Sequence, residues 1–174
     1  MEVYQAMLKR RSIRKYKDKP VEKEKVMKLL AAAMAAPSGH NLRPWSFVVI
    51  DDRDILDELS EVHKYAKMLK EAPLCIAVCG NSYSEGRYQT LWDQDCSAAT
   101  ENILIQATEL GLGSVWLGIY PSESNRTRTK RILKLPDMIT PFALIPIGYP
   151  DEEKEERTQF DEARIHNNFW GNEY

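Results

Sequence analysis

From residue 91 to about residue 110 the sequence favours one long helix, ended by Gly111 and Gly113, and this helix has almost no polar face. A helix that is apolar around most of its circumference must be covered on several sides. The segment therefore predicts a central helix, either in the core of one subunit or shared with a partner subunit. Small residues fill its first half, namely Cys96, Ser97, Ala98, Ala99 and Thr100, and apolar residues follow at Ile103, Leu104, Ile105, Ala107 and Leu110.

Three other segments have helical character. Apolar residues spaced i, i+3, i+4, i+7 and i+8 from Val26 to Met34 predict an amphipathic helix that Pro37 stops just after Ala36. Helical structure is also expected over residues 55–70 and over residues 122–133.

Four short apolar runs predict strands between these helices. Residues 45–50 are strand-like in composition, and residues 74–79 are bounded by Pro73 and Gly80, which indicates a strand buried on both faces. Residues 114–117 and 142–145 are the other two, and Pro146 predicts an edge or a bulge after the last one. No G-x-G-x-x-G follows any of these strands, so nothing indicates a dinucleotide-binding Rossmann fold.

The overall composition limits the class of protein. With 174 residues, of which 43% are hydrophobic, one compact domain over residues 1–174 is expected. A net charge of -2 argues against broad nucleic-acid binding. No apolar run is long enough to cross a membrane, and the start of the chain lacks a signal-peptide pattern, so a cytoplasmic protein is expected.

The three cysteines, Cys75, Cys79 and Cys96, are odd in number and form no C-x-x-C pair. A disulfide framework or a metal site is therefore not expected, and we interpret them as core thiols. On a strand, Cys75 and Cys79 would share a face, which leaves a redox role as the alternative.

Six positive charges lie within residues 9–17, although the whole chain is slightly acidic. Arg10, Arg11, Arg14 and the hydroxyl of Ser12 can surround one phosphate, because guanidinium groups bind its oxygens bidentately. The alternative is a solvated charge run. A second basic run, with Arg126, Arg128, Lys130 and Arg131, is expected to be a solvated helix face, with attraction of a nucleotide as its alternative.

Side-chain catalysis has little support in this sequence. It contains no G-x-S-x-G, H-E-x-x-H or P-loop, and its three histidines accompany no nucleophile motif. What remains is the basic run of residues 9–17 and a loop at residues 37–44 that is rich in turn residues. This pair suits a phosphorylated cofactor whose ring carries out the reaction, so no catalytic side chain is predicted.

Arg10-Arg11-Ser12-Ile13-Arg14, together with residues 36–45, resembles the nitroreductase family of FMN-dependent oxidoreductases. The likeness continues through residues 114–118 and 147–150, so it covers nearly the whole chain in the family's order. It implies an α+β fold with a central, mostly antiparallel sheet flanked by helices, in an intertwined homodimer that binds FMN at the subunit interface.

The same resemblance implies a role for each matching residue. Arg10, Arg11, Ser12 and Arg14 would hold the FMN phosphate and the neighbouring ribityl or pyrimidine atoms, and Arg157 is a further candidate for the phosphate. The partner subunit would supply Pro37, Ser38, Gly39 and Asn41, while Leu117 and Gly118 would lie near the flavin N5. Trp45 and Trp116 are expected to pack in the core rather than to stack on the flavin.

The implied activity is reduction of small acceptors, such as nitroaromatics or quinones, by NAD(P)H in a ping-pong cycle. The alternative is a flavin-binding protein that NAD(P)H does not turn over, namely a carrier, a sensor or an enzyme fed by another electron donor. Arg43 stands where the family commonly has glutamine, and we expect this cation to favour an anionic substrate or a phosphorylated nicotinamide.

The C-terminal residues 150–174 are highly charged as far as Arg164 and then include His166, Phe169 and Trp170. Aromatic residues beyond a charged stretch suggest a docking segment. We expect this extension to dock on the partner subunit.

Overall fold

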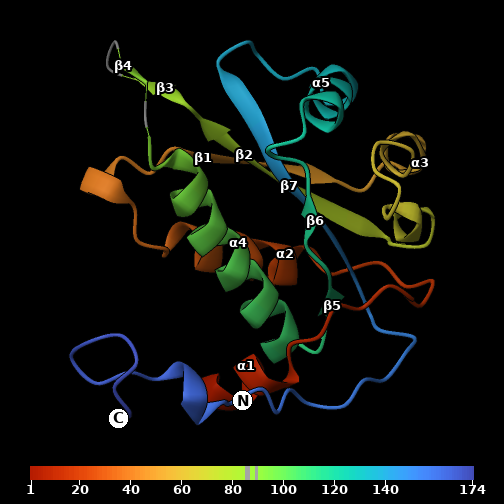
Figure 1. Cartoon of the computed structure of the whole chain (residues 1–174). Helices are drawn as coiled ribbons and strands as arrows, with labels where there is room; N and C mark the ends of the chain where they lie inside the picture. The colour runs from red at the N-terminus through yellow and green to blue at the C-terminus, as the bar shows by residue number, and fades with distance from the viewer. Residues whose placement is uncertain (85–86, 89) are drawn as a thin grey trace.

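The computed structural model describes residues 1–84, 87–88 and 90–174. Its centre is a five-stranded antiparallel sheet in the order β1-β2-β7-β5, with β6 also pairing with β7 (Figure 1). A separate two-stranded hairpin consists of β3 (Tyr83–Ser84) and β4 (Arg87–Tyr88). The strands of the main sheet are β1 (Trp45–Ile50), β2 (Leu74–Asn81), β5 (Gly113–Ser114), β6 (Leu117–Gly118) and β7 (Ile139–Gly148).

Helices cover both faces of this sheet, which confirms the predicted α+β architecture (Figure 1). One face carries α2 (Lys23–Met34) and α4 (Trp92–Glu109), and α1 (Val3–Lys9) packs on α4. The other face carries α3 (Arg53–Leu59), the short 3-10 helix η2 (Lys67–Lys70) and α5 (Glu123–Ile132). A second short 3-10 helix, η1 (Gly39–Asn41), precedes β1, and a third, η3 (Glu162–Arg164), lies in the C-terminal segment.

Strand β2 divides the core into two layers, because successive side chains of a strand point to opposite faces. Ile76 and Val78 pack in the layer beneath α2 and α4, whereas Cys75, Ala77 and Cys79 pack against α3 and η2. The prediction that this strand is buried on both faces is therefore confirmed. The cysteines are buried and free, and burial raises the pKa of the Cys79 thiol to about 12. They are core thiols, as predicted.

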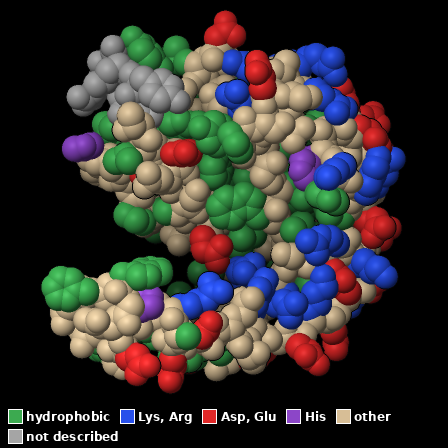
Figure 2. Space-filling model, in the orientation of Figure 1, with side chains coloured by type: hydrophobic (Ala, Val, Ile, Leu, Met, Phe, Trp, Pro, Cys, Tyr) green, Lys and Arg blue, Asp and Glu red, His purple; other side chains and the backbone are tan. Residues whose placement is uncertain are grey.

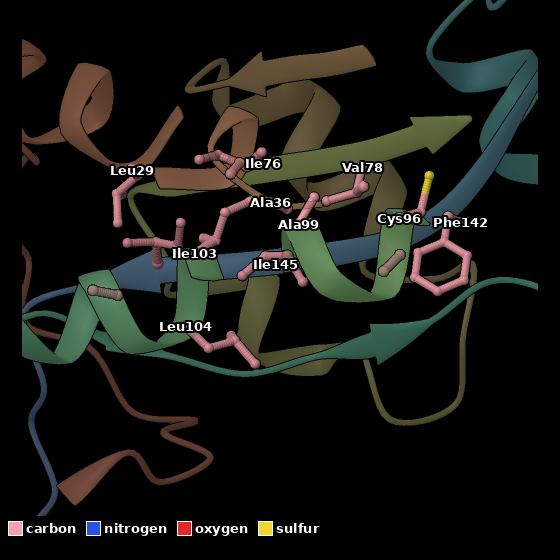
Figure 3. Close-up of a cluster of buried hydrophobic side chains, with 14 of the residues drawn as sticks. Leu29, Ala36, Ile76, Val78, Cys96, Ala99, Ile103, Leu104, Phe142 and Ile145 are labelled. Atoms are coloured by element: carbon pink, nitrogen blue, oxygen red, sulfur yellow. The ribbon is translucent and has the colours of Figure 1, made fainter. Parts of the chain in front are cut away.

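The central helix predicted near residues 91–110 is α4. Ile103 and Ala99 lie against Ile76, Val78 and Ile145 of the sheet (Figure 3). Eight of its residues are buried: Trp92, Asp95, Cys96, Ala99, Thr100, Ile103, Leu104 and Ala107. The helix is thus a core helix of this chain, and its sharing with a partner subunit stays a prediction.

Two predicted elements are interrupted in the structure. The helix expected over residues 55–70 ends at Leu59, where the Ser60 hydroxyl donates to the carbonyl of Asp57 at 2.7 Å and competes with the helical hydrogen-bond pattern. The strand expected over residues 114–117 is two short strands, because Val115 and Trp116 lie between β5 and β6.

The edge or bulge predicted from Pro146 is wrong: β7 lies in the interior of the sheet, and the register shift between β2 and β7 falls between Val78 and Cys79, away from this proline. Pro146 is tolerated because β6 pairs with Leu144 and β5 with Ile147, which leaves a break beside the proline. Its carbonyl accepts a hydrogen bond from the Tyr16 hydroxyl at 3.3 Å. No helix in the described part of the chain is both long and apolar enough to span a bilayer.

Candidate functional site

The basic run of residues 9–17 leaves α1 in an extended conformation and lies along β5. Ser12 forms a parallel bridge with Ser114, and the Ile13 amide donates to the Ser114 carbonyl at 3.0 Å. The Ile13 side chain packs directly on Gly113, where an added Cβ would lie 2.7 Å from the Ile13 Cγ2 atom. Close packing of two backbones therefore fixes the position of the run.

The extended backbone sends neighbouring arginines in different directions. The Arg10 Nε atom lies 3.3 Å from a carboxylate oxygen of Glu101 on α4, and the Arg10 side chain is 22% exposed. Arg11 turns to the C-terminal segment, where its guanidinium donates to the Glu155 carbonyl. With Ile13, Arg11 lines a hollow of about 470 Å³. Arg10 and Arg11 thus occupy different surroundings.

Residues that follow β7 hold the other side of this run. The Arg14 amide donates to Glu152 Oε1 at 2.5 Å, and Lys154 Nζ donates to the Ser12 carbonyl at 2.5 Å. Burial alone would raise the pKa of the Glu152 carboxyl, but the hydrogen bonds from Arg14 and Lys154 leave that pKa below its ordinary value. An ionised carboxylate therefore anchors the backbone of the run.

Arg157 lies next to the same run. Its amide donates to the Leu8 carbonyl in α1 at 2.9 Å, and its Nη1 donates to Gln159 at 2.8 Å. The Nε atoms of Arg11 and Arg157 are buried, and neither has a hydrogen-bond partner among the described residues. Buried donors without partners are rare in proteins, so these two indicate a site for an acceptor, such as a phosphate oxygen. Figure 2 shows Lys and Arg side chains gathered beside the hollow between the C-terminal arm and the body.

Leu117 and Gly118 lie on the connection that continues from Ser114. Leu117 is buried against the sheet, whereas Gly118 is exposed. An added Cβ at Gly118 would approach only the Tyr120 carbonyl oxygen, at 3.8 Å. The backbone at Gly118 is therefore open to a flat molecule, and packing within this chain does not require glycine there.

The loop at residues 37–44 has an unusual backbone. His40, Asn41 and Arg43 all have positive φ angles, of 52°, 57° and 47°. Asparagine adopts this conformation more readily than arginine, and such residues cluster at functional sites. Asn41 is therefore a turn residue with a left-handed backbone.

Two side chains stabilise this loop. The Gly39 amide donates to Asp95 Oδ1 at 2.9 Å, and the Ser38 hydroxyl accepts from the Arg43 amide at 3.0 Å. Pro37 and Asn41 are exposed. The loop therefore presents Pro37 and Asn41 to the outside, from a position fixed by the first turns of α4.

The predicted site residues form two separate groups within one chain. Residues 10–14, Arg157 and Ser114 lie together, whereas the loop at residues 37–44 lies at the other end of α4 (Figure 1). Leu117 and Gly118 lie between these groups, because β6 pairs with Leu144 and Ala143 of β7 while Ser114 pairs with Ile147. Trp45 and Trp116 pack against the core, as expected, and Trp116 makes an edge-on contact with Phe142.

Three acidic residues that hold the predicted site were not indicated by the sequence. Glu101, Glu152 and Asp95 each hold a group of the predicted site, yet no motif marks them. Asp95 carries one available signal, since it is an acid on the buried face of an otherwise apolar helix.

The family model described as "Nitroreductase family" matches residues 7–64 and 60–149. The chain belongs to the nitroreductase family. The structure agrees with this membership, because solved nitroreductases superpose on nearly its whole length.

Three nitroreductase relatives illustrate the similarity. A protein of Methanothermobacter thermautotrophicus named "Putative NADH dehydrogenase/NAD(P)H nitroreductase" is 45% identical over 98% of this chain and 88% of its own length. A solved structure of the same name from Parabacteroides distasonis has a TM-score of 0.92 and 42% identity, covering 98% of this chain and 99% of that one. An "FMN-dependent Nitroreductase" from Clostridium difficile has a TM-score of 0.88 and 38% identity, covering 95% and 98%.

Proposed function

We propose that this chain is an FMN-dependent oxidoreductase that uses NAD(P)H to reduce small acceptors such as nitroaromatics or quinones. The observation that carries the proposal is the basic site beside β5, where the extended run is fixed on Ser114 and the buried Nε atom of Arg157 has no partner among the described residues. This site fits a phosphorylated cofactor. The similarity to an FMN-dependent nitroreductase identifies FMN as that cofactor.

The residues of this chain would bind and orient FMN rather than react. Arg10, Ser12 and Arg14 would hold the phosphate and neighbouring ribityl or pyrimidine atoms, with Arg11 and Arg157 completing the charge. Arg10 is paired with Glu101. A phosphate would therefore displace the Glu101 carboxylate from the Arg10 guanidinium or share the guanidinium with it. The open backbone at Leu117 and Gly118 would face the ring. When bound, FMN supplies the redox chemistry by accepting a hydride and passing the electrons to an acceptor.

We also propose that the active form is a homodimer. The loop with Pro37, Ser38, Gly39 and Asn41 lies away from the basic site of its own chain, so a second copy would supply it. The C-terminal segment 150–174 carries several aromatic side chains with little cover: Phe160 is 79% exposed, Phe169 75%, Trp170 91% and Tyr174 92%. Docking on a partner would bury them. Sedimentation velocity should give a dimer, and Phe169→Ser with Trp170→Ser should weaken it.

Two measurements test the cofactor and the donor. The purified protein should show a flavin absorbance spectrum and release FMN on denaturation. Anaerobic mixing with NADH or NADPH should bleach that spectrum rapidly. Bound FMN that neither nucleotide reduces would support the alternative, a flavin protein served by another donor. A colourless protein that cannot take up FMN would overturn the proposal.

The acceptor half of the cycle needs its own measurement. Parallel lines in double-reciprocal plots with a quinone or a nitroaromatic compound would support the ping-pong cycle. Arg43 is exposed on the loop at residues 37–44. Arg43→Gln should lower any preference for anionic acceptors or for NADPH, and unchanged kinetics would count against a role for this cation.

A further inference from the structure

Two cations of the second basic run lie in surroundings different from those of the others. Arg126 and Lys130 are four residues apart on α5, so they share a face of that helix, and both are partly buried. With the first residues of β7 they line a hollow of about 230 Å³. Arg128 and Arg131 are exposed, and Arg131 lies 3.8 Å from Glu58 on α3. Arg128 and Arg131 therefore form the expected solvated face, whereas Arg126 and Lys130 also line this hollow.

Arg126 is held beside the proposed flavin site. Its guanidinium carbon lies 5.8 Å from the centre of the Tyr120 ring, and Tyr120 follows Gly118 by two residues. The Arg126 Nε atom is buried and has no hydrogen-bond partner within the described part of the chain. A guanidinium that rests on an aromatic ring keeps its donors aligned for a ligand.

The hollow has the composition of an anion site. Lys130 contributes a second cation, although its Nζ already donates to the Asp137 carbonyl at 2.7 Å. Thr127 and Thr140 add hydroxyl groups to the lining. Glu123 is the acid in this lining, and the Lys130 amine also lies 3.8 Å from Asp137 Oδ1. Arg126 is therefore the cation of the lining that no carboxylate engages among the described residues.

We propose that this hollow binds the 2′-phosphate of NADPH, so that the chain prefers NADPH to NADH. The inference rests on the proposed function, because it assigns the donor of that same reaction. Of the two nicotinamide donors, only NADPH has this phosphate. A hollow of about 230 Å³ is too small for a whole dinucleotide but holds a phosphate and part of its sugar. In NADPH the pyrophosphate separates the nicotinamide from the 2′-phosphate. With the nicotinamide on the flavin near Gly118, the 2′-phosphate would therefore bind at a separate site.

Binding of nucleotide fragments tests this site without any redox turnover. Isothermal titration calorimetry with the FMN-loaded protein should show tighter binding of adenosine 2′,5′-bisphosphate than of adenosine 5′-monophosphate. Arg126→Gln should weaken binding of the bisphosphate by about tenfold or more, which is the loss expected for one charged hydrogen bond. Binding of the monophosphate should be unchanged. Lys130→Gln should have a smaller effect, because Asp137 already engages that amine.

Two further variants separate a local contact from a general effect of charge. Arg131→Gln removes the same charge from the same helix, outside the hollow, and should leave bisphosphate binding unchanged. Glu123→Gln removes the acid of the lining and should strengthen binding. Arg126→Lys keeps the charge but not the planar fork, so it should retain part of the affinity.

The proposal fails if the native protein binds the two fragments equally. It also fails if Arg126→Gln keeps native bisphosphate affinity at an unchanged melting temperature. In steady-state kinetics, Arg126→Gln should raise KM for NADPH but not for NADH. A protein that binds FMN and is reduced equally by both donors would overturn this inference alone, whereas a protein that cannot bind FMN would overturn the proposed function.

Discussion

The two basic runs of this chain have similar charge and different backbones. In residues 9–17 the backbone is extended, so Arg10 faces Glu101 on α4 while Arg11 faces the C-terminal segment. In α5 the backbone is helical, so Arg126 and Lys130 share a hollow while Arg131 faces Glu58 on α3.

The difference shows that charge density alone does not define a binding site. An extended run alternates its side chains, so an anion held by Arg10 is not reached equally by its neighbour Arg11. A helical run brings together side chains four apart, which separates Arg126 and Lys130 from the exposed Arg128. The backbone period therefore selects which cations can bind one ligand.

The largest expected effect is on FMN binding by the extended run. Arg10→Gln removes a charged donor from the proposed phosphate site, so the dissociation constant for FMN should rise by about 10- to 100-fold. Quenching of flavin fluorescence during titration of the apoprotein measures this constant. Lys15→Gln is the control, because Lys15 is an exposed cation of the same run. Equal losses of FMN affinity in both variants would mean that the run attracts FMN by its overall positive charge rather than by a specific contact from Arg10.

Two glycine variants should separate packing of the extended run from access of the cofactor. At Gly113 an added Cβ would lie 2.7 Å from Ile13 Cγ2, so Gly113→Ala should cost about 1–3 kcal/mol of unfolding free energy. At Gly118 the nearest atom would be 3.8 Å away, so Gly118→Ala should change stability by less than about 0.5 kcal/mol.

Urea denaturation of the apoprotein measures the stability of both variants, and titration with FMN measures their affinity for the cofactor. Gly118→Ala should weaken FMN binding although the fold is intact, because the added methyl group would occupy the space between the backbone and the flavin ring. If Gly118→Ala bound FMN like the native protein, the proposed position of the flavin beside β6 would be wrong.

Much of this fold could be predicted from local sequence. The period of α2 and the apolar run of β2 are local signals, and both elements form close to the predicted residues, although α2 ends at Met34 rather than at Ala36. The site was less predictable, because it depends on partners distant in sequence. Glu152 accepts a hydrogen bond from the Arg14 amide although 138 residues separate them in sequence, and no local pattern near either residue predicts this contact. The prediction from Pro146 was wrong for the same reason, because the break between β5 and β6 that accommodates an interior proline involves residues distant in sequence.

A smaller effect is expected at Arg11, the neighbour that points the other way. Its guanidinium donates to the Glu155 carbonyl, so Arg11→Gln should loosen the C-terminal segment and lower the unfolding free energy by about 1 kcal/mol. Its effect on FMN should be weaker than that of Arg10→Gln, because the side chain lies on the opposite side of the run. Limited proteolysis after residue 150 should become faster. A loss of FMN affinity as large as that of Arg10→Gln would contradict the alternation.

The smallest expected effect is a pH dependence in the anchoring of the extended run. The pKa of Glu152 lies below its ordinary value of 4.5, so the folded state favours the ionised carboxylate that accepts from the Arg14 amide. A carboxylate with a lowered pKa stabilises the folded protein at pH values above its ordinary pKa. This stabilisation is lost as the pH falls through the folded-state pKa. The melting-temperature difference between the native protein and Glu152→Gln should therefore be constant near neutral pH and shrink below about pH 4.5. Glu153→Gln removes an exposed neighbouring carboxylate and should not reproduce this pattern. A difference that stayed constant to low pH would mean that packing, rather than the charge of Glu152, holds the run on the sheet.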